Sequence, residues 1–280
     1  MNMNTQRQMR PVLKWAGGKT QLLDTILANA PSSYNNYYEP FIGGGSVLLF
    51  IKPQKAYIND INEQLINLYI QIRGCAGKVI ELVNKLDSVP CDKEMYYKIR
   101  ERYNEKIASG ELDHECAALM IWINKHCFNG LYRVNGKGAF NVPYNNRNVG
   151  KSIDEANIML ISDYLKQSEI QITCTDFEVA CQSVAKGDFV YFDSPYVPQS
   201  ATADFTDYTK AGFTLADHER LAALFRKLDS IGAKLMLSNN DVQLVHELYG
   251  GYRIQQLEVR RMINSNALLR KGREVLVTNY

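Results

Sequence analysis

The chain has few of the residues that build metal centres and disulfide frameworks. It holds six cysteines and four histidines among 280 residues, and no two cysteines stand as a Cys-x-x-Cys pair. This composition argues against a zinc site and favours reduced thiols in a cytoplasm. No apolar run approaches the length that spans a membrane, and the polar first ten residues are unlike a signal peptide. We therefore expect a cytoplasmic protein that binds neither a metal nor a membrane.

Acidic side chains are missing from three stretches of the chain, although its net charge is only +2. Residues 1–23, 116–153 and 259–273 together hold 14 of the 32 lysines and arginines and none of the 30 acidic residues. If the three stretches share a face, that face suits the phosphates of a nucleic acid. The alternative is that they are solvated basic surface.

A complete phosphate-binding loop of the NTPase kind is also missing. Gly18-Lys19-Thr20 is similar to the end of such a loop, but Leu13 stands where its first glycine is needed. The two glycines are instead predicted to open a helix over residues 19–30. The free N–H groups of that helix and the Lys19 ammonium favour a carboxylate or another anion, although a simple glycine turn explains the pattern as well.

A second glycine loop, Gly43-Gly44-Gly45, lies between a predicted strand over 37–41 and a predicted helix over 47–51. Strand, loop and helix together indicate a cofactor-binding turn, but the spacing is not the Gly-x-Gly-x-x-Gly of dinucleotide enzymes. The next predicted strand, 56–60, ends on Asp60, about twenty residues after the first. An acid at this offset suits ribose hydroxyls, and a helix cap is the alternative.

The most specific chemical signal is Asp193-Ser194-Pro195-Tyr196, which follows a short apolar and aromatic run over 188–192. That run predicts a buried strand, and ligands bind at the carboxyl ends of strands in open α/β sheets. The exocyclic amine of a nucleobase is a poor nucleophile until its two N–H bonds are accepted, and Asp193 and the Ser194 carbonyl are candidates for this role. Pro195 would fix the turn, and Tyr196 would stack on a base that has left the helix. An ordinary strand-to-turn exit is the alternative.

The middle of the chain predicts a separate recognition region. Apolar residues recur at helical spacing through 75–127, and the pattern breaks over 128–145, where Asn135-Gly136 between short runs signals a β-hairpin. The hairpin stretch has no acid and mixes amides, basic residues and rings, so it fits the major groove of DNA. An exposed structural hairpin is the alternative.

The second half of the chain continues an alternating pattern of strands and helices, including a strand over 170–175 that leads to Asp176-Phe177 and a strand over 234–237. We predict a doubly wound α/β fold with an inserted helical and hairpin region. The predicted domains are a first catalytic part, a target-recognition insert and a second catalytic part, at residues 1–61, 62–150 and 151–280.

Two further features lie near the ends of predicted strands. Arg260 and Arg261 come just past a strand and are candidate phosphate clamps. The polar residues 197–213 begin directly after Tyr196, where a lid over the site would lie.

The motifs together resemble those of the Dam-type DNA adenine N6-methyltransferases. Amino-methyltransferases share a signature of Asp, Asn or Ser, then Pro-Pro, then Tyr or Phe, and Ser194 stands in place of the first proline. The Dam-type subgroup also carries Lys-Trp-Ala-Gly-Gly-Lys, Glu-Pro-Phe-x-Gly-Gly-Gly and Asn-Asp, which occur at 14–19, 39–45 and 59–60. The resemblance spans nearly the whole chain and keeps the order of the subgroup's motifs.

The resemblance implies an S-adenosylmethionine-dependent methyltransferase fold with a target-recognition insert. It implies cofactor contacts by Trp15, Lys19, Phe41, Gly43, Asp60, Asp176, Phe177 and Asp193. It implies that the target base is held by Asp193, Ser194, Pro195 and Tyr196. It implies DNA contacts by Lys14, Phe128, Asn129, Leu131, Arg133 and Pro143. Among these, Lys14 and Arg133 are expected to read guanines.

From the motifs and the resemblance we expect methyl transfer from S-adenosylmethionine to adenine N6 in duplex DNA, within GATC and after base flipping. The expected partners are double-stranded DNA and, without direct contact, a restriction endonuclease that acts on the same site. Two alternatives remain. One is an amino-methyltransferase with another target, such as cytosine N4 or RNA. The other is a catalytically silent DNA-binding regulator that keeps the fold.

Overall fold

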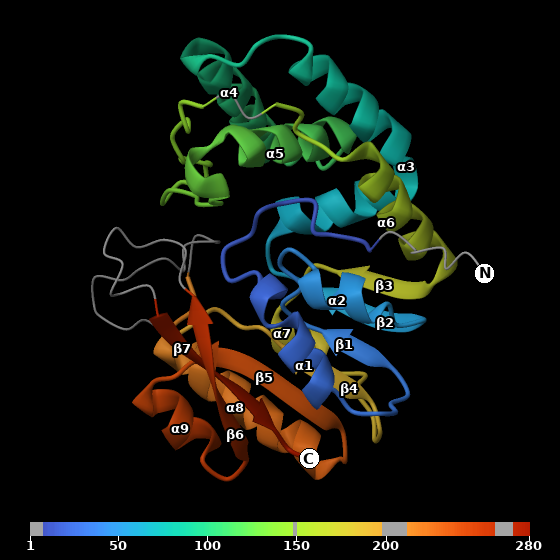
Figure 1. Ribbon diagram of the computed structural model, residues 1–280, viewed down its shortest axis with the longest axis vertical. Helices are drawn as coiled ribbons and strands as arrows, with labels where there is room; N and C mark the ends of the chain where they lie inside the picture. Colours follow the sequence, from blue (N-terminus) through green and yellow to red (C-terminus); the bar gives the residue numbers. More distant parts are fainter. Residues whose placement is uncertain (1–7, 148–149, 198–211, 261–270) are drawn as a thin grey trace, which may run out of the picture. The chain divides into compact units, whose positions relative to one another are not determined.

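The computed structural model describes residues 8–147, 150–197, 212–260 and 271–280, without the side chains of Arg260 and Lys271 (Figure 1). Within these residues the chain forms two compact units, and each is described by itself. The first unit comes from Met1–Gly18, Gly43–Gln54 and Glu63–Glu169, and the second comes from Lys19–Ile42, Lys55–Asn62 and Ile170–Tyr280. None of the described helices is long and apolar enough to cross a lipid bilayer.

The second unit is built on a seven-stranded sheet with the order β3-β2-β1-β4-β5-β7-β6 (Figure 1). β1 pairs in parallel with β2 and β4, and β4 pairs in parallel with β5, whereas β7 runs antiparallel to β5 and β6. The strands are β1 (Tyr37–Glu39), β2 (Lys55–Asn59), β3 (Glu169–Thr173), β4 (Phe189–Phe192), β5 (Lys234–Asn240), β6 (Arg253–Arg260) and β7 (Lys271–Thr278). The order reverses between β1 and β4, which is where open sheets of this kind bind ligands.

Continuous apolar and aromatic runs explain why these segments are buried strands. The four side chains of β4 are all buried, as a strand covered on both faces requires. Val190 and Phe192 belong to a core with side chains of α7, α8 and α9, while Tyr37 and Phe189 point to the other face, over which α1 lies (Figure 1). The helices of this unit are α1 (Leu23–Asn29), α7 (Phe177–Ala180), α8 (Leu215–Ser230) and α9 (Gln243–Tyr249), with the single turn η1 (Lys19–Gln21). Helices on both faces of a mainly parallel sheet confirm the predicted doubly wound fold.

β5 is longer than the sequence predicts, and the prediction that this strand ends at residue 237 is wrong. The strand continues through Ser238, Asn239 and Asn240 because β7 pairs with it as far as Asn240, which lies opposite Glu274. The three added side chains are polar and buried. Buried polar groups need hydrogen-bond partners, and these three find them in residues 193–197, which follow β4.

The first unit is mainly helical, with α3 packed against α5 and α6, and α4 packed against α5. Its helices are α2 (Ser46–Ile51), α3 (Glu63–Asp87), α4 (Lys93–Ser109), α5 (His114–His126) and α6 (Glu155–Gln167), with the single turn η2 (Phe128–Gly130). Tyr96, Tyr103 and Trp122 fill the space between α4 and α5 and have no exposed surface. The helical pattern predicted for residues 75–127 is confirmed.

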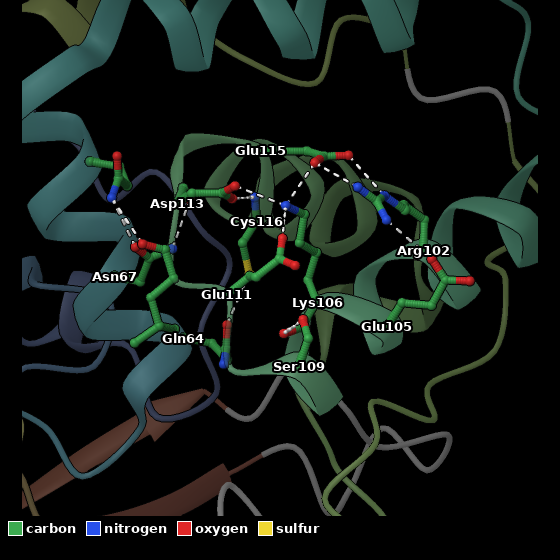
Figure 2. A network of polar contacts seen from close by, with 12 residues as sticks. Gln64, Asn67, Arg102, Glu105, Lys106, Ser109, Glu111, Asp113, Glu115 and Cys116 are labelled. Carbon is green, nitrogen blue, oxygen red and sulfur yellow. Dashed lines mark hydrogen bonds and ion pairs between the residues drawn. The ribbon is translucent and has the colours of Figure 1, made fainter.

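A buried lysine joins the end of α4 to the start of α5 (Figure 2). Lys106 is 4 % exposed, and its Nζ lies 2.5 Å from Glu111, 2.8 Å from Asp113 and 2.9 Å from Glu115. Burial alone would lower the pKa of Lys106, but the three carboxylates outweigh it and raise that pKa above its ordinary value. Asp113 also caps α5 by accepting the Cys116 N–H at 2.8 Å. The network therefore fixes the helix pair that supports the following hairpin.

The stretch 128–145, called the recognition hairpin below after the role predicted for it, folds back on itself. Isolated bridges pair Val134 with Phe140 and Cys127 with Tyr144. The turn closes through the Gly138 N–H, which donates to the Asn135 carbonyl at 2.8 Å, and Gly138 has a φ of +84° that favours glycine. Helix α4 supports the hairpin from within the unit: Asn104 exchanges two hydrogen bonds with the backbone of Phe140, at 2.8 and 3.1 Å.

Candidate active site and recognition hairpin

Residues 193–197, called the catalytic turn below after the role predicted for them, follow β4 at the point where the strand order reverses. The crevice outside such a point binds ligands in open α/β sheets. The neighbouring strand β1 ends at Glu39 and leads directly into Pro40 and Phe41. The topology therefore brings the catalytic turn and Phe41 to the same edge of the sheet.

Asp193 is held by an ion pair and a hydrogen bond. Its Oδ1 accepts from the Lys19 ammonium at 2.5 Å and from the Ser238 hydroxyl at 3.0 Å. Lys19 is 3 % exposed and Asp193 is 20 % exposed, so water is largely excluded from the pair. Burial raises the pKa of the Asp193 carboxyl and outweighs the lowering by Lys19 and Ser238. A carboxylate offers about four acceptor positions, so Asp193 keeps the capacity to accept a hydrogen bond from a substrate amine.

Tyr196 is oriented through its hydroxyl and its ring. The hydroxyl donates to the carboxylate of Glu274 on β7, and the Lys19 ammonium lies 4.8 Å from the ring centroid. Burial, with the nearby carboxylates of Asp193 and Glu274, holds the pKa of the Tyr196 hydroxyl well above its ordinary value, so it remains a donor. A ring held in this way can stack on a base that has left the helix.

Two asparagines at the end of β5 hold the rest of the catalytic turn. Asn239 Nδ2 donates to the Ser194 hydroxyl at 3.3 Å, and Asn239 Oδ1 accepts the Val197 N–H at 3.3 Å. Asn240 Nδ2 donates to the Val197 carbonyl at 2.7 Å. With Ser238 bound to Asp193, three consecutive residues of β5 contact the turn. The turn is therefore held by side chains and not only by its own backbone.

Asn59, at the end of β2, joins the loops that carry other predicted cofactor contacts. Its Nδ2 donates to the carbonyls of Pro40 at 3.1 Å and Thr175 at 2.9 Å. Its Oδ1 accepts the Thr175 N–H at 2.9 Å. Each of these three residues is followed directly by a predicted cofactor contact: Asp60, Phe41 and Asp176, respectively. The structure thus gathers these three candidates at one edge of the sheet of the second unit.

Asp60 and Asp176 each also cap a neighbouring turn, which was the alternative role predicted for them. Asp60 Oδ1 accepts the Asn62 N–H at 3.0 Å. Asp176 Oδ1 accepts the Glu178 N–H at 2.9 Å at the start of α7 and pairs with Arg220 at 2.9 Å. A carboxylate offers about four acceptor positions, so a cap leaves capacity for a ligand.

Phe177 and Phe41 form an apolar wall beside Asp176. Their ring centroids are 5.4 Å apart, and Phe177 is 5 % exposed within the core of the second unit. The guanidinium of Arg220 lies 4.8 Å from the Phe177 ring centroid. Phe41 is only partly buried. Of the two rings, Phe41 therefore has more surface to offer a ligand.

Trp15 and Gly43, two further predicted cofactor contacts, lie together in the first unit. A Cβ on Gly43 would stand 3.0 Å from Trp15 Cδ1, and the φ of Gly43 is +48°, so contact and backbone both favour glycine. Tyr69 donates its hydroxyl to the Gly43 carbonyl at 2.9 Å. The Trp15 ring stacks on Tyr132 of the recognition hairpin with 5.3 Å between centroids. Trp15 is thus held between the glycine loop and the hairpin.

Lys14 is anchored through its backbone and presents an exposed side chain. Its N–H donates to Asn124 Oδ1 at 2.8 Å, and its carbonyl accepts from Asn124 Nδ2 at 3.0 Å. Asn124 Nδ2 also donates to the Gly130 carbonyl at 3.0 Å. A Cβ on Gly130 would stand 2.7 Å from Lys14 Cδ, so the absence of a side chain there lets Lys14 lie against the hairpin. The buried amide of Asn124 therefore fixes Lys14 beside the predicted DNA contacts.

Arg133 is exposed on the recognition hairpin and is oriented by a neighbour across it. Its Nε donates to Asn141 Oδ1 at 2.8 Å, while the Asn141 N–H donates to the Arg133 carbonyl at 3.1 Å. The two terminal nitrogens of the guanidinium have no partner among the described residues. A guanidinium held at Nε keeps the forked donor pair that matches a guanine edge.

The remaining predicted DNA contacts lie along the same hairpin. Phe128 is 51 % exposed, and its N–H donates to the carbonyl of the exposed Pro143 at 2.8 Å. Asn129 has a φ of +56° in the turn η2, and Leu131 is partly buried just after it. The structure thus collects all six predicted DNA contacts of the first unit, including Lys14 and Arg133, within one small region of that unit.

The other predicted clamp and lid residues fall at the limits of the described chain. Arg260 is the last residue of β6, and its side chain is not described. Arg261 and residues 198–211 of the predicted lid lie outside the described residues. Their roles stay predictions.

Sequence reasoning missed the residues that hold the site. These residues are Asn59, Asn124, Asn141, Ser238, Asn239, Asn240 and Glu274. The available signal was Ser-Asn-Asn directly after the apolar run Leu235-Met236-Leu237, because polar residues continuing a buried strand need partners. For the others, only the fold shows which loops they join.

A doubly wound sheet whose switch point carries Asp-Ser-Pro-Tyr defines the class of the protein, an amino-methyltransferase. The comparison with known families is more specific. A family model described as D12 class N6 adenine-specific DNA methyltransferase matches residues 15–263. The chain belongs to this family and is an adenine-specific DNA methyltransferase with S-adenosylmethionine as its cofactor.

Similar proteins cover almost the whole chain. A type II methyltransferase of Lactococcus lactis subsp. cremoris is 42% identical over 97% of this chain and 96% of its own length. The type II methyltransferase M.MjaIII of Methanocaldococcus jannaschii is 41% identical over 98% of this chain and 100% of its own length. A DNA adenine methylase of Serratia marcescens is 32% identical over 98% of this chain and 99% of its own length. The predicted resemblance is confirmed.

Proposed function

We propose that this enzyme methylates adenine N6 within GATC of duplex DNA after the target base has left the helix. The observation that carries the chemistry is the Asp193 carboxylate, which Lys19 and Ser238 hold at the switch point of the sheet. Membership of an adenine-specific DNA methyltransferase family favours this function over cytosine N4 or RNA as the target. It equally disfavours a silent DNA-binding regulator.

S-adenosylmethionine, when bound, supplies an electrophilic methyl group. In the proposed mechanism, Asp193 accepts one N–H of the adenine amine and the Ser194 carbonyl accepts the other. These bonds draw the nitrogen toward tetrahedral geometry and free its lone pair for direct in-line attack. The amine would lose one proton on gaining the methyl group, and the Asp193 carboxylate, which accepts one of its N–H bonds, can take up that proton. Pro195 fixes the turn, and Tyr196 stacks on the flipped base.

The donor set of the described residues fits the proposed cofactor. Lys19 supplies a buried ammonium for a carboxylate, Asp60 and Asp176 supply acceptors for hydroxyls or an amine, and Phe41 supplies an apolar face. We propose as the full set of cofactor contacts Trp15, Lys19, Phe41, Gly43, Asp60, Asp176, Phe177 and Asp193. Their roles rest on residue chemistry and on the family resemblance.

We propose that residues 62–150 act as the target-recognition region and that the recognition hairpin enters the major groove. Arg133, oriented by Asn141, reads one guanine, and Lys14 reads the outer guanine. Phe128 stacks into the gap near the flipped base, while neighbouring bases are contacted by Asn129, Leu131 and Pro143. Arg260 and Arg261 clamp phosphates. The support is the exposure of Lys14, Phe128, Arg133 and Pro143 and the absence of acids from residues 116–153.

The biological setting belongs to the same proposal. Relatives named type II methyltransferases favour a restriction–modification system, in which a restriction endonuclease acts on the same site without touching this protein. We propose a cytoplasmic location, where duplex DNA and reduced, unpaired cysteines occur together.

Labelled-methyl transfer to two duplexes tests the proposal. One duplex contains GATC, and the other carries at that adenine an analogue without the 6-amino group. Label on the first duplex alone is expected and supports the base, the atom and the site. Label on both, or on neither while other DNA is methylated, contradicts GATC. No label on any DNA, despite cofactor binding, contradicts the assigned chemistry.

A further inference from the structure

We propose that Asn239 is the positioning residue of the catalytic turn and that it holds Ser194 by a hydrogen bond where a proline would hold the backbone covalently. The inference rests on the proposed role of the Ser194 carbonyl as an acceptor for the adenine amine. It assigns a part in the reaction to a residue at the end of β5 that need not touch the substrate.

The first support is the position of Ser194 between two fixed residues. Asp193 is bound by Lys19 and Ser238, and Pro195 has a φ set by its ring. Pro195 restricts the ψ of Ser194, but no ring fixes the φ of Ser194, so rotation about the Ser194 N–Cα bond could still carry its carbonyl away from the amine. A fixed acceptor geometry needs another restraint at this position, because catalytic groups lose effectiveness when they are displaced by as little as about 1 Å.

The second support is the restraint that the structure provides. Asn239 Nδ2 donates to the Ser194 hydroxyl at 3.3 Å, and both side chains are 2 % exposed. The same amide accepts the Val197 N–H at 3.3 Å through Oδ1. One buried amide therefore binds the turn on both sides of Pro195 and Tyr196. In a buried site such a bond does not compete with water, which favours a single geometry.

The third support is that Asn239 is itself held in place. Its Oδ1 also accepts the Asn240 N–H at 2.9 Å, and β7 pairs with this part of β5 through the register of Asn239 with Val275. Its neighbours on the strand, Ser238 and Asn240, bind Asp193 and Val197. The amide is thus carried by a rigid strand, as a positioning group must be.

The test measures single-turnover methyl transfer at saturating DNA and cofactor, together with the Kd of each. Ser194→Ala removes the hydroxyl and leaves β5 intact. Asn239→Ala removes the whole amide. We expect Ser194→Ala to slow transfer about tenfold and Asn239→Ala at least as much, with both Kd values within about twofold of wild type. A bond shared by the two residues also predicts that the double alanine variant is no slower than Asn239→Ala.

The substitution Ser194→Pro distinguishes a displaced carbonyl at position 194 from a misfolded protein. In the Asn239→Ala background, Ser194→Pro should restore a large part of the rate, about fivefold or more, because its ring restrains the same backbone. The matched control is Asn279→Ala, at the far end of the sheet, where the amide binds Asp229 and the Ala233 carbonyl. That variant should lose stability and keep its rate of transfer.

Each outcome decides the inference. A wild-type rate for Ser194→Ala, or no gain from Ser194→Pro in the Asn239→Ala background, overturns it. Asp193→Ala keeps the two proposals apart: methylation by that variant at the wild-type rate overturns the proposed mechanism. If Asp193→Ala is inactive and the Ser194 and Asn239 variants are as fast as wild type, only the positioning role fails.

Discussion

The catalytic turn and the recognition hairpin are held in opposite ways. Four residues of the turn, Asp193, Ser194, Tyr196 and Val197, have a polar atom bound by a side chain from β5 or β7. The hairpin is held through its backbone and its inward rings, while its candidate DNA contacts face outward. Methyl transfer needs a geometry fixed before the substrate arrives, whereas base reading needs side chains that can reach a groove.

The exposed fractions of the side chains show the same contrast. Ser194 is 2 % exposed and Phe128 is 51 % exposed, although both are assigned to the target DNA. Asn104 and Tyr96 hold the hairpin from α4 by bonds to backbone atoms, so these bonds do not occupy its outward side chains. Substitutions in the turn should therefore change the rate of chemistry, and substitutions on the hairpin should change the choice of site.

The largest expected effect is on the rate of methyl transfer when the carboxylate of the catalytic turn is removed. Asp193→Ala should lower the single-turnover rate by at least about 10³-fold, because it removes the acceptor that polarises the amine and leaves the buried Lys19 without this partner. DNA binding, measured by fluorescence anisotropy, should remain. The matched control is Asp188→Asn at the other end of β4, where the carboxylate binds the backbone of Asn36 and Ala185. That change should affect stability and not the rate of the chemical step.

The next effect concerns the choice of site. Arg133→Ala should cost about 1–3 kcal/mol of discrimination against a duplex with the contacted guanine replaced, because the forked donor pair is lost. Asn141→Ala should cost less, since it removes only the acceptor that orients Nε. Ratios of kcat/KM on matched duplexes measure both. Lys137→Ala, at the tip of the same hairpin, is the control and should weaken binding to both duplexes equally.

The support of the hairpin can be tested through the buried lysine of Figure 2. Lys106→Met should lower the free energy of unfolding by about 1–3 kcal/mol, because it removes charge-assisted bonds to three carboxylates. Urea unfolding followed by circular dichroism measures the loss. Lys98→Met, an exposed position on the same helix, should change stability little. Equal stability of the Lys106 variant and wild type would show that the network adds nothing.

The smallest expected effect is a change of the free energy of unfolding with pH, to which one histidine in each unit contributes. Burial lowers the pKa of His126, in the first unit, and of His218, in the second, to about 4. The unfolded chain takes up these protons near pH 6.5 and the folded chain does not, so stability is full above that pH and falls as pH drops toward 4. The slope should reach at most about 1.4 kcal/mol per pH unit for each histidine. Urea unfolding at several pH values should show a flatter dependence for His126→Gln and for His218→Gln.

Contiguous motifs made the centre of the site predictable from the sequence. Asp193 to Tyr196 stand side by side, and the apolar run before them predicts the strand that carries them. Ser238 and Glu274 were not predictable in the same way, because they lie 45 and 78 residues from their partners in the turn. The pairing of β5 with β4 brings Ser238 to the turn, and the pairing of β7 with β5 brings Glu274 there. The sequence states neither pairing.

The hairpin shows the same limit at a smaller scale. Asn135-Gly136 predicts the place of the turn, but the positive φ is at Gly138. The reason is that Asn135 Oδ1 accepts the N–H groups of Lys137 and Ala139, which sets the turn by a side chain. The position of the turn along the chain was thus predictable from the sequence. The side-chain hydrogen bonds that fix its conformation were not.

One measurement tests the division between chemistry and recognition most directly. Values of kcat/KM for methyl transfer are compared for wild type, Asn239→Ala and Arg133→Ala on two duplexes, one with GATC and one with the contacted guanine replaced. We predict that Asn239→Ala slows both duplexes by the same factor, while Arg133→Ala changes the ratio between them about tenfold or more. A changed ratio for Asn239→Ala with an unchanged ratio for Arg133→Ala would contradict the account.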